Sequence, residues 1–213
     1  MSRIGIFGGT FDPVHVGHLD VARAALRAAE LDRVLLMPAN VPPHRSPPHV
    51  SAPHRFAMCA LAIAGHDRLG LLDDEMLSSE PSYTSSTLAR LEARGMNTRE
   101  LFLITGADAF RDIGSWKDYP AILERCHFVV ISRPGQTASS LRETLPSLAG
   151  RMRAASPRVV QDDEPSVVLV DSPTAPVSST EIRRRAAEGT SLAGLVTDLV
   201  ADYIRKHELY GKS

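Results

Sequence analysis

The residues that most constrain the fold lie between Ile4 and His18. A short apolar run at 4–7 is typical of a buried strand, the pair Gly8-Gly9 ends it, and a helical pattern begins near Gly17. A strand, a glycine turn and a helix start form the first half of a βαβ unit. Because backbone N–H groups and the positive end of the helix dipole meet at such a turn, it favours a bound anion, phosphate above all.

The rest of the chain repeats the alternation of apolar runs and helical patterns. Further strands are predicted at 34–37, 69–72, 101–104, 128–131 and 167–170, the last of them at a sheet edge. This alternation predicts a Rossmann-like, doubly wound α/β fold, with a mainly parallel sheet and helices on both faces. We expect a single domain over residues 1–213, with a small C-terminal helical portion at about 178–213. Residues 136–164 have weak periodicity and predict a helix plus an irregular excursion.

Composition argues against several classes of protein. The formal net charge is −1, so no global signature of nucleic-acid binding is present. No apolar run approaches the roughly 18 residues of a membrane span, and the chain opens with a strand instead of a targeting segment. We therefore expect a cytoplasmic protein without nucleic-acid or membrane partners, and a homo-oligomer stays open. Cys59 and Cys126 lie in apolar surroundings and are expected to be buried and inert.

Polar or glycine-rich clusters follow five of the six predicted strands. They lie at 8–18, 38–53, 105–108, 132–135 and 173–183. In a parallel sheet these positions share one edge, where open α/β sheets bind their ligands. The clusters therefore predict one site built from both ends of the chain.

The two histidines of the opening stretch leave several roles open. The stretch lacks the P-loop pattern and the Gly-x-Gly-x-x-Gly of dinucleotide-binding proteins. At the start of a helix, His15 and His18 can donate to phosphate oxygens and to charge that develops on them. They can also be ordinary loop residues. Metal ligation needs a third ligand, and none lies at a recognisable spacing.

Two motifs carry a family resemblance. Gly8-Gly-Thr-Phe-Asp-Pro-Val-His-Val-Gly-His18 resembles the signature of the HxGH nucleotidyltransferase superfamily. Val177-Ser-Ser-Thr-Glu-Ile-Arg183 resembles its second signature, with valine for the usual isoleucine. The stretches 42–45, 82–88, 106–116, 133–135 and 203–210 resemble bacterial nicotinate mononucleotide adenylyltransferases in particular. Departures are small: Arg45 stands where lysine is common, and Ser86 where aspartate is common.

The resemblance implies an enzyme of NAD biosynthesis. The 5′-phosphate of nicotinate mononucleotide would attack the α-phosphorus of ATP in line, and pyrophosphate would leave without a covalent intermediate. Two alternatives stay open: another HxGH nucleotidyltransferase, such as phosphopantetheine adenylyltransferase, or a nucleotide-binding module without turnover. The residues alone do not settle the preference for nicotinate over nicotinamide mononucleotide.

The resemblance also implies the residues of the site. His18 and His15 are the expected catalytic residues, with His18 stabilising the phosphorus under attack. Both are expected to bind ATP together with Gly8, Gly9, Thr10, Phe11, Ser179, Thr180 and Arg183. The residues expected to bind the mononucleotide are Arg45, Thr84, Gly106, Asp108, Trp116 and Arg133. No protein ligand for a metal is expected, because Mg²⁺ would be held by substrate phosphates and water.

Several neighbouring residues have simpler interpretations. Trp116 can pack in the core, Asp108 can cap a short helix, and Arg133 can form a salt bridge. Arg184 and Arg185 are expected on the surface, because successive helical residues diverge by about 100°. The acidic run at 73–75 is expected to be a solvated strand end.

Overall fold

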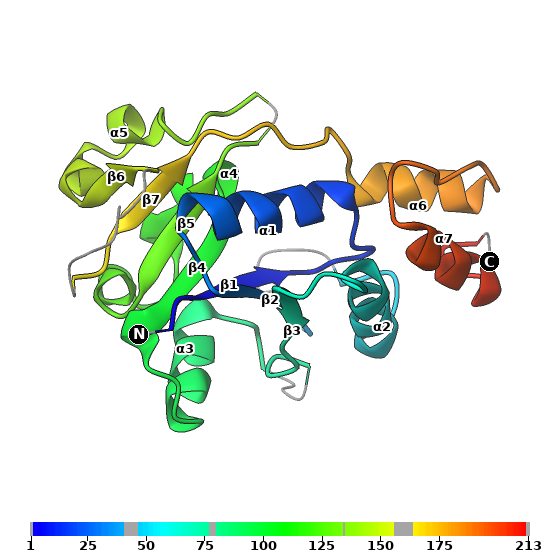
Figure 1. Cartoon of the computed structure of the whole chain (residues 1–213), viewed down its shortest axis with the longest axis horizontal. Coiled ribbons are helices and arrows are strands. Elements are labelled where there is room, and N and C mark those ends of the chain that lie inside the picture. Colours follow the sequence, from blue (N-terminus) through cyan, green and yellow to red (C-terminus); the bar gives the residue numbers. More distant parts are fainter. Residues whose placement is uncertain (1, 41–46, 77–79, 134, 156–163, 212–213) are drawn as a thin grey trace.

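The computed structural model describes residues 2–40, 47–76, 80–133, 135–155 and 164–211. Within these residues, seven parallel strands form one sheet in the order β3-β2-β1-β4-β5-β7-β6 (Figure 1). The strands are β1 Ile4–Gly9, β2 Arg33–Pro38, β3 Leu69–Leu71, β4 Leu101–Gly106, β5 His127–Ile131, β6 Met152–Ala154 and β7 Val167–Val170. The order reverses between β1 and β4, so the predicted doubly wound fold is confirmed.

Helices cover both faces of this sheet. Those that share one hydrophobic cluster are α1 Val16–Ala28, α2 Ala52–Ala62, α6 Ser179–Ala187 and α7 Asp198–Lys206. Those of the opposite cluster are α3 Thr84–Ala93, α4 Ala107–Arg111 and α5 Leu141–Thr144. Short 3₁₀ turns lie at Thr98–Glu100, Ile113–Ser115, Ala121–Glu124 and Pro146–Arg151. None of the helices in the described part of the chain is long and apolar enough to cross a membrane.

Alternation within the strands divides the core into these two clusters. In β4, Phe102 and Ile104 belong to the cluster under α1, whereas Leu101 and Leu103 belong to the cluster under α3. Successive side chains of a strand point to opposite faces, so both sets are buried. A continuous apolar run is the pattern that such two-sided burial requires.

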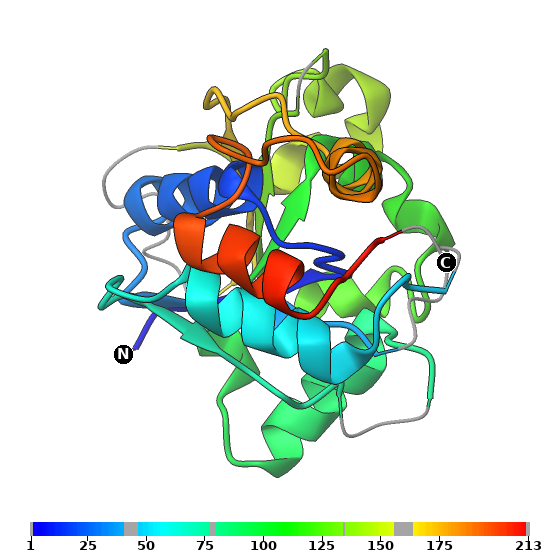
Figure 2. The ribbon, with the colours of Figure 1, turned by 90° about the vertical axis from the view of Figure 1, so that its right-hand side faces the viewer.

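The C-terminal helices pack against the first half of the chain. Helix α7 lies beside α2 (Figure 2). The backbone N–H of Val16, at the start of α1, donates to the carbonyl of Leu195 at 3.0 Å. Ile182 of α6 and Val200 of α7 are buried in the cluster that α1 shares. The end of the chain therefore meets the turn between β1 and α1.

Two predictions about the second half of the chain are wrong. Strand β7 is not at the edge, because β6 pairs with it and forms that edge. Of the three residues of β6, only Met152 is buried, so the strand has no apolar run by which to recognise it. The apolar pattern that includes Leu195 and Val196 also predicts a last helix that has begun by Leu195, whereas α7 begins at Asp198. Residues 156–163 of the predicted excursion lie outside the described residues.

His127 is a titratable side chain buried within the sheet. It begins β5 and is 3% exposed. Its ring stacks on Phe102 with 4.6 Å between ring centroids, and its Nδ1 accepts the backbone N–H of Ser166 at 3.2 Å. Burial lowers the pKa of His127 to about 4. The folded chain therefore holds this ring in its neutral form.

We predict that His127 makes the fold sensitive to acid. The unfolded chain takes up the proton near pH 6.5, whereas the folded chain excludes it down to about pH 4. The contribution of His127 to stability is therefore complete above pH 6.5 and is lost as the pH falls toward 4. A shift of this size corresponds to up to about 3 kcal/mol.

Urea unfolding at a series of pH values measures this effect. His127→Phe should lose less free energy of unfolding than the wild type between pH 6.5 and 4.5. The exposed residue His207, changed to Gln, serves as the control and should keep the wild-type dependence. An identical pH dependence in wild type and His127→Phe would contradict the prediction.

Candidate active site

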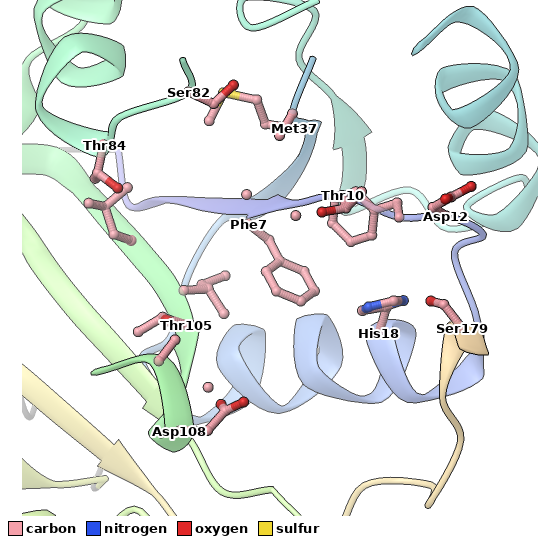
Figure 3. A pocket seen from close by; sticks show the side chains of 18 of the residues that line it. Phe7, Thr10, Asp12, His18, Met37, Ser82, Thr84, Thr105, Asp108 and Ser179 are labelled. Carbon is pink, nitrogen blue, oxygen red and sulfur yellow. The ribbon is translucent and has the colours of Figure 1, made fainter. Parts of the chain in front are cut away.

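The carboxyl ends of the strands open into one large cleft of about 1440 Å³ (Figure 3). All five polar clusters predicted at this edge contribute to its lining. The volume exceeds the roughly 300–1,000 Å³ that is usual for one small ligand. The cleft therefore has room for two nucleotides at once.

The structure brings the predicted site residues to this cleft. Those predicted for ATP that line it are Gly8, Gly9, Thr10, Phe11, His15, His18, Ser179, Thr180 and Arg183. Those predicted for the mononucleotide that line it are Thr84, Gly106, Asp108, Trp116 and Arg133. Arg45 lies outside the described residues. Figure 3 shows the two sets at opposite ends, with His18 and Ser179 at one and Thr84 and Asp108 at the other.

His18 is held in one tautomer at the start of α1. The backbone N–H of His15 donates to Nδ1 of His18 at 3.2 Å. A ring nitrogen that accepts a hydrogen bond carries no proton, so the neutral imidazole carries its proton on Nε2. The ring also packs edge-on against Phe11, with 4.9 Å between ring centroids. The N–H that His18 can offer to a ligand is therefore Nε2–H.

His15 packs directly behind His18. It is 4% exposed, and the two rings stack with centroids 3.6 Å apart. Burial lowers the pKa of His15 to about 4, and the positive charge of Arg133 acts in the same direction. At neutral pH, His15 is thus an uncharged ring that fixes the orientation of its neighbour.

Helix α6 forms hydrogen bonds to the turn that follows β1. The hydroxyl of Ser179 donates to the carbonyl of Pro13 at 2.9 Å, and Nη1 of Arg183 donates to the carbonyl of Asp12 at 2.7 Å. The side chain of Ser178 accepts the N–H of Glu181 at 3.2 Å and so caps the start of α6. Two helix N-termini therefore face the same turn, and each favours negative charge.

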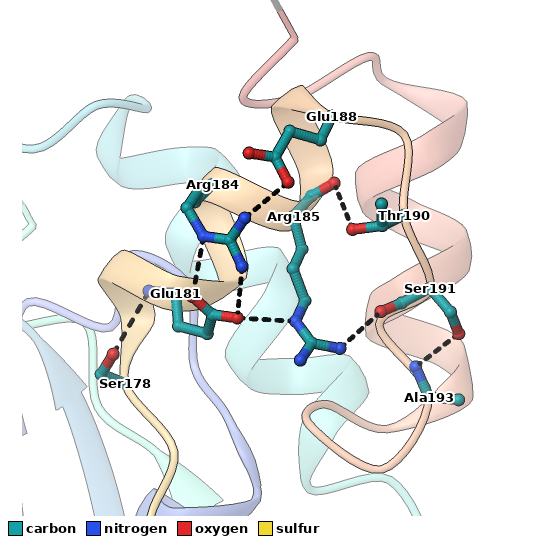
Figure 4. Close-up of polar contacts among 8 residues, drawn as sticks. All are labelled: Ser178, Glu181, Arg184, Arg185, Glu188, Thr190, Ser191 and Ala193. Atoms are coloured by element: carbon teal, nitrogen blue, oxygen red, sulfur yellow. Dashed lines mark hydrogen bonds and ion pairs between the residues drawn. The ribbon is translucent and has the colours of Figure 1, made fainter.

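The three successive arginines of α6 point in different directions, as predicted. Arg184 donates to Glu181 at 2.8 and 2.9 Å and to Glu188 at 2.6 Å (Figure 4). Arg185 donates to Glu181 at 2.7 Å. Such exposed ion pairs contribute little to stability, but they hold two of the cations on the surface. Of the three, Arg183 lines the cleft.

The other end of the cleft is built around Gly106. A Cβ at this position would overlap the carboxylate of Asp108 and lie 2.9 Å from Nε of Arg133, so a larger residue here would displace these two side chains. Arg133 itself lies 3.8 Å from Asp108 in a half-exposed ion pair. Trp116 is half-buried against Phe128 and also lines the cleft. These contacts agree with both interpretations of Trp116, which are packing and ligand binding. They also agree with both interpretations of Arg133, which are a salt bridge and ligand binding.

In the acidic run at 73–75, Asp73 is exposed as expected, but Asp74 and Glu75 are not. Glu75 is 4% exposed, lines the cleft, and accepts the hydroxyl of Thr87 in α3 at 2.5 Å. Burial raises the pKa of Glu75. Asp74 is also buried and pairs with Arg94 at 2.6 Å. The sequence around these residues gives no sign of their burial, because their partners lie farther along the chain. Helix α3 begins nine residues beyond Glu75.

Arg55 is a second residue that the sequence analysis missed. It is 1% exposed in α2, and its Nη1 donates to the carbonyls of Thr10 at 2.7 Å and Ala39 at 2.6 Å. Its Nε donates to the carbonyl of Val50 at 3.3 Å. One guanidinium thus ties the turn after β1 to the chain that follows β2. An arginine in an otherwise apolar helical stripe has no pattern that marks it as buried.

Comparison with known proteins agrees with this geometry. The cytidylyltransferase-like family matches residues 6–185. A probable nicotinate-nucleotide adenylyltransferase of Pseudomonas paraeruginosa is 41% identical over 98% of this chain and 97% of its own. One from Citrifermentans bemidjiense is 38% identical over 98% of both chains. In structure, the Plasmodium falciparum nicotinic acid mononucleotide adenylyltransferase complexed with NaAD is similar with a TM-score of 0.71, at 20% identity, over 99% and 98% of the two chains.

The fold and the two helix starts at one turn define an enzyme of the nucleotidyltransferase class. Within this class, the chain belongs to the nicotinate-nucleotide adenylyltransferases. The family predicted from the two motifs is confirmed, and with it the expected function in NAD biosynthesis.

We predict that Arg55 is a main support of the turn after β1. Arg55→Leu leaves three carbonyls without this donor, and each loss costs about 1–3 kcal/mol in a buried site. The free energy of unfolding should therefore fall by about 3 kcal/mol or more, as measured by urea unfolding. Arg55→Lys keeps the charge but loses the planar fork of donors, so its loss should be smaller.

Arg205→Leu is the matched control for this prediction. Arg205 is 75% exposed and pairs with Asp202, so its loss should stay below about 1 kcal/mol. Equal losses in the Arg55 and Arg205 variants would show that the buried guanidinium does not support the turn.

Proposed function

We propose that this cleft joins ATP and nicotinate mononucleotide, with nicotinate adenine dinucleotide and pyrophosphate as products. The observation that carries the proposal is the meeting of two helix N-termini, with His18 on α1 and Arg183 on α6, at one turn of a cleft with room for two nucleotides. The names of the relatives support the choice of mononucleotide. They also favour this reaction over that of a phosphopantetheine adenylyltransferase or a module without turnover.

The chemistry suits a site without a strong base. A 5′-phosphate oxygen of the mononucleotide forms a bond to the α-phosphorus of ATP. The bond from that phosphorus to the oxygen bridging to the β-phosphate breaks, and pyrophosphate leaves. Since nucleophile and leaving group are both anionic phosphates, catalysis consists of positioning and charge stabilisation. Positioning alone can supply roughly 7–11 kcal/mol.

The ATP end of the cleft has two parts in this proposal. Nε2–H of His18 donates to the α-phosphate, where negative charge grows in the transition state, and His15 keeps that ring in place. Ser179, Thr180 and Arg183 bind the β- and γ-phosphates, which become the leaving group. The turn formed by Gly8, Gly9, Thr10 and Phe11 lies against the nucleotide.

The mononucleotide occupies the opposite end. Thr84, at the start of α3, and Arg45 bind its phosphate or ribose. Trp116 stacks on the pyridine ring. Gly106 allows close approach between Asp108 and Arg133, which contact the ribose and the phosphates.

Mg²⁺ would enter with ATP. Among the described residues, no group of three His, Cys, Asp or Glu side chains could hold a metal ion. We propose that substrate phosphates and water bind this ion, because Mg²⁺ in such sites keeps several waters and binds to substrate phosphates. It would neutralise part of the phosphate charge.

We further propose that residues 178–213 complete the ATP site of a single domain. We also propose that the enzyme works in the cytoplasm, where ATP is made.

Pyrophosphate release tests the proposed function. The purified chain should release pyrophosphate from ATP when nicotinate mononucleotide is added. Nicotinamide mononucleotide and phosphopantetheine are the comparison substrates, and both should give slower release. Faster release with phosphopantetheine would identify the other transferase reaction, and no release with any acceptor would identify a binding module.

We predict that His18→Ala lowers kcat by about a hundredfold or more, because a donor to charge that develops in the transition state is worth about 3–4 kcal/mol. The helix start remains, so the KM for ATP should rise far less. Steady-state pyrophosphate release measures both constants, and circular dichroism checks the fold. A kcat near that of the wild type would remove His18 from the proposed role.

A further inference from the structure

The last turn of the chain reaches back to the turn after β1. Tyr210 follows α7, and its hydroxyl donates to Oδ1 of Asp12 at 2.8 Å, 198 residues away in sequence. Burial raises the pKa of Tyr210, and the negative charge of Asp12 adds to this effect. The phenol therefore keeps its proton and donates throughout the working pH range.

Asp12 gathers contacts from three separate segments. Its carboxylate is 5% exposed. Oδ1 accepts from Tyr210, and Oδ2 accepts the backbone N–H of His49 at 2.7 Å. Its backbone carbonyl accepts Arg183 of α6 at 2.7 Å. Arg183 and Tyr210 therefore bind the same residue, Arg183 at its backbone carbonyl and Tyr210 at its side chain.

We propose that Tyr210 is a positioning residue for the triphosphate of ATP, acting through Asp12 on Arg183. This inference rests on the proposed function for the role of Arg183. It assigns a role to Tyr210, whose side chain is not among those that line the cleft. Tyr210 contacts the side chain of Asp12, whereas Arg183 contacts its main chain, so the end of the chain sets where the guanidinium stands.

Removing one hydroxyl tests this inference without removing the aromatic ring. Tyr210→Phe should raise the KM for ATP about three- to tenfold, while kcat and the KM for nicotinate mononucleotide stay within twofold. Because Arg183 is assigned to the β- and γ-phosphates, the Kd of a non-hydrolysable ATP analogue should rise in parallel. The Kd of AMP, which lacks those phosphates, should not change. Steady-state kinetics and isothermal titration of the full chain measure these values.

Tyr203→Phe is the matched control. Tyr203 lies in α7 and precedes Tyr210 in the chain. Its hydroxyl forms a hydrogen bond with Nδ1 of His54 in α2 at 3.0 Å, instead of with Asp12. This variant also loses a single tyrosine hydroxyl and its hydrogen bond, but it leaves the contact between Tyr210 and Asp12 in place, so all its constants should match the wild type. Equal behaviour of the two variants would overturn the inference. So would a Tyr210→Phe variant that weakens AMP and the ATP analogue alike, because that result indicates a general structural role.

A double-mutant cycle tests the path through Asp12. In an Asp12→Ala background, Tyr210→Phe should cause no further change in the Kd of the ATP analogue. A further rise would contradict the inference. These titrations need no turnover, so they judge Tyr210 separately from the proposed reaction: a wild type that binds the analogue but releases no pyrophosphate would count against the reaction alone.

Discussion

The turn between β1 and α1 is held from several sides by hydrogen bonds to its backbone. Arg55 donates to the carbonyl of Thr10, Arg183 to that of Asp12, and Ser179 to that of Pro13. A turn whose carbonyls are satisfied in this way cannot move without breaking contacts to α2 and α6 together. Its fixed position determines where α1 begins, and therefore where His18 stands in the cleft.

This constraint explains why the two ends of the chain share one site. Helix α6 is far from β1 in sequence, yet its first turn contacts the turn after β1 directly. The dipoles of α1 and α6 and the charge of Arg183 then favour negative charge at one place. For a transfer between two phosphates, such fixed positive groups and fixed substrate positions supply most of the catalysis that the chemistry needs.

Much of the fold could be predicted from sequence, because its central strands are apolar runs buried on two faces. The runs at 4–7, 34–37 and 101–104 lie within β1, β2 and β4. Strand β6 could not be predicted, since two of its three residues are exposed. The cleft residues that lie in the two motifs could be predicted, whereas the burial of Glu75 and Arg55 could not. Their burial depends on partners from other segments, which no local pattern shows.

The central claim is that α1 and α6 bind one triphosphate between them, and two neighbouring arginines test it most directly. Arg183 reaches the turn after β1, whereas Arg184 pairs with Glu181 and Glu188 on the surface. Isothermal titration with ATP should show that Arg183→Ala raises the Kd about tenfold or more, as expected for charge-assisted hydrogen bonds of about 1.5–3 kcal/mol. Arg184→Ala should leave the Kd within twofold. Equal weakening by the two substitutions, or none by Arg183→Ala, would contradict the claim.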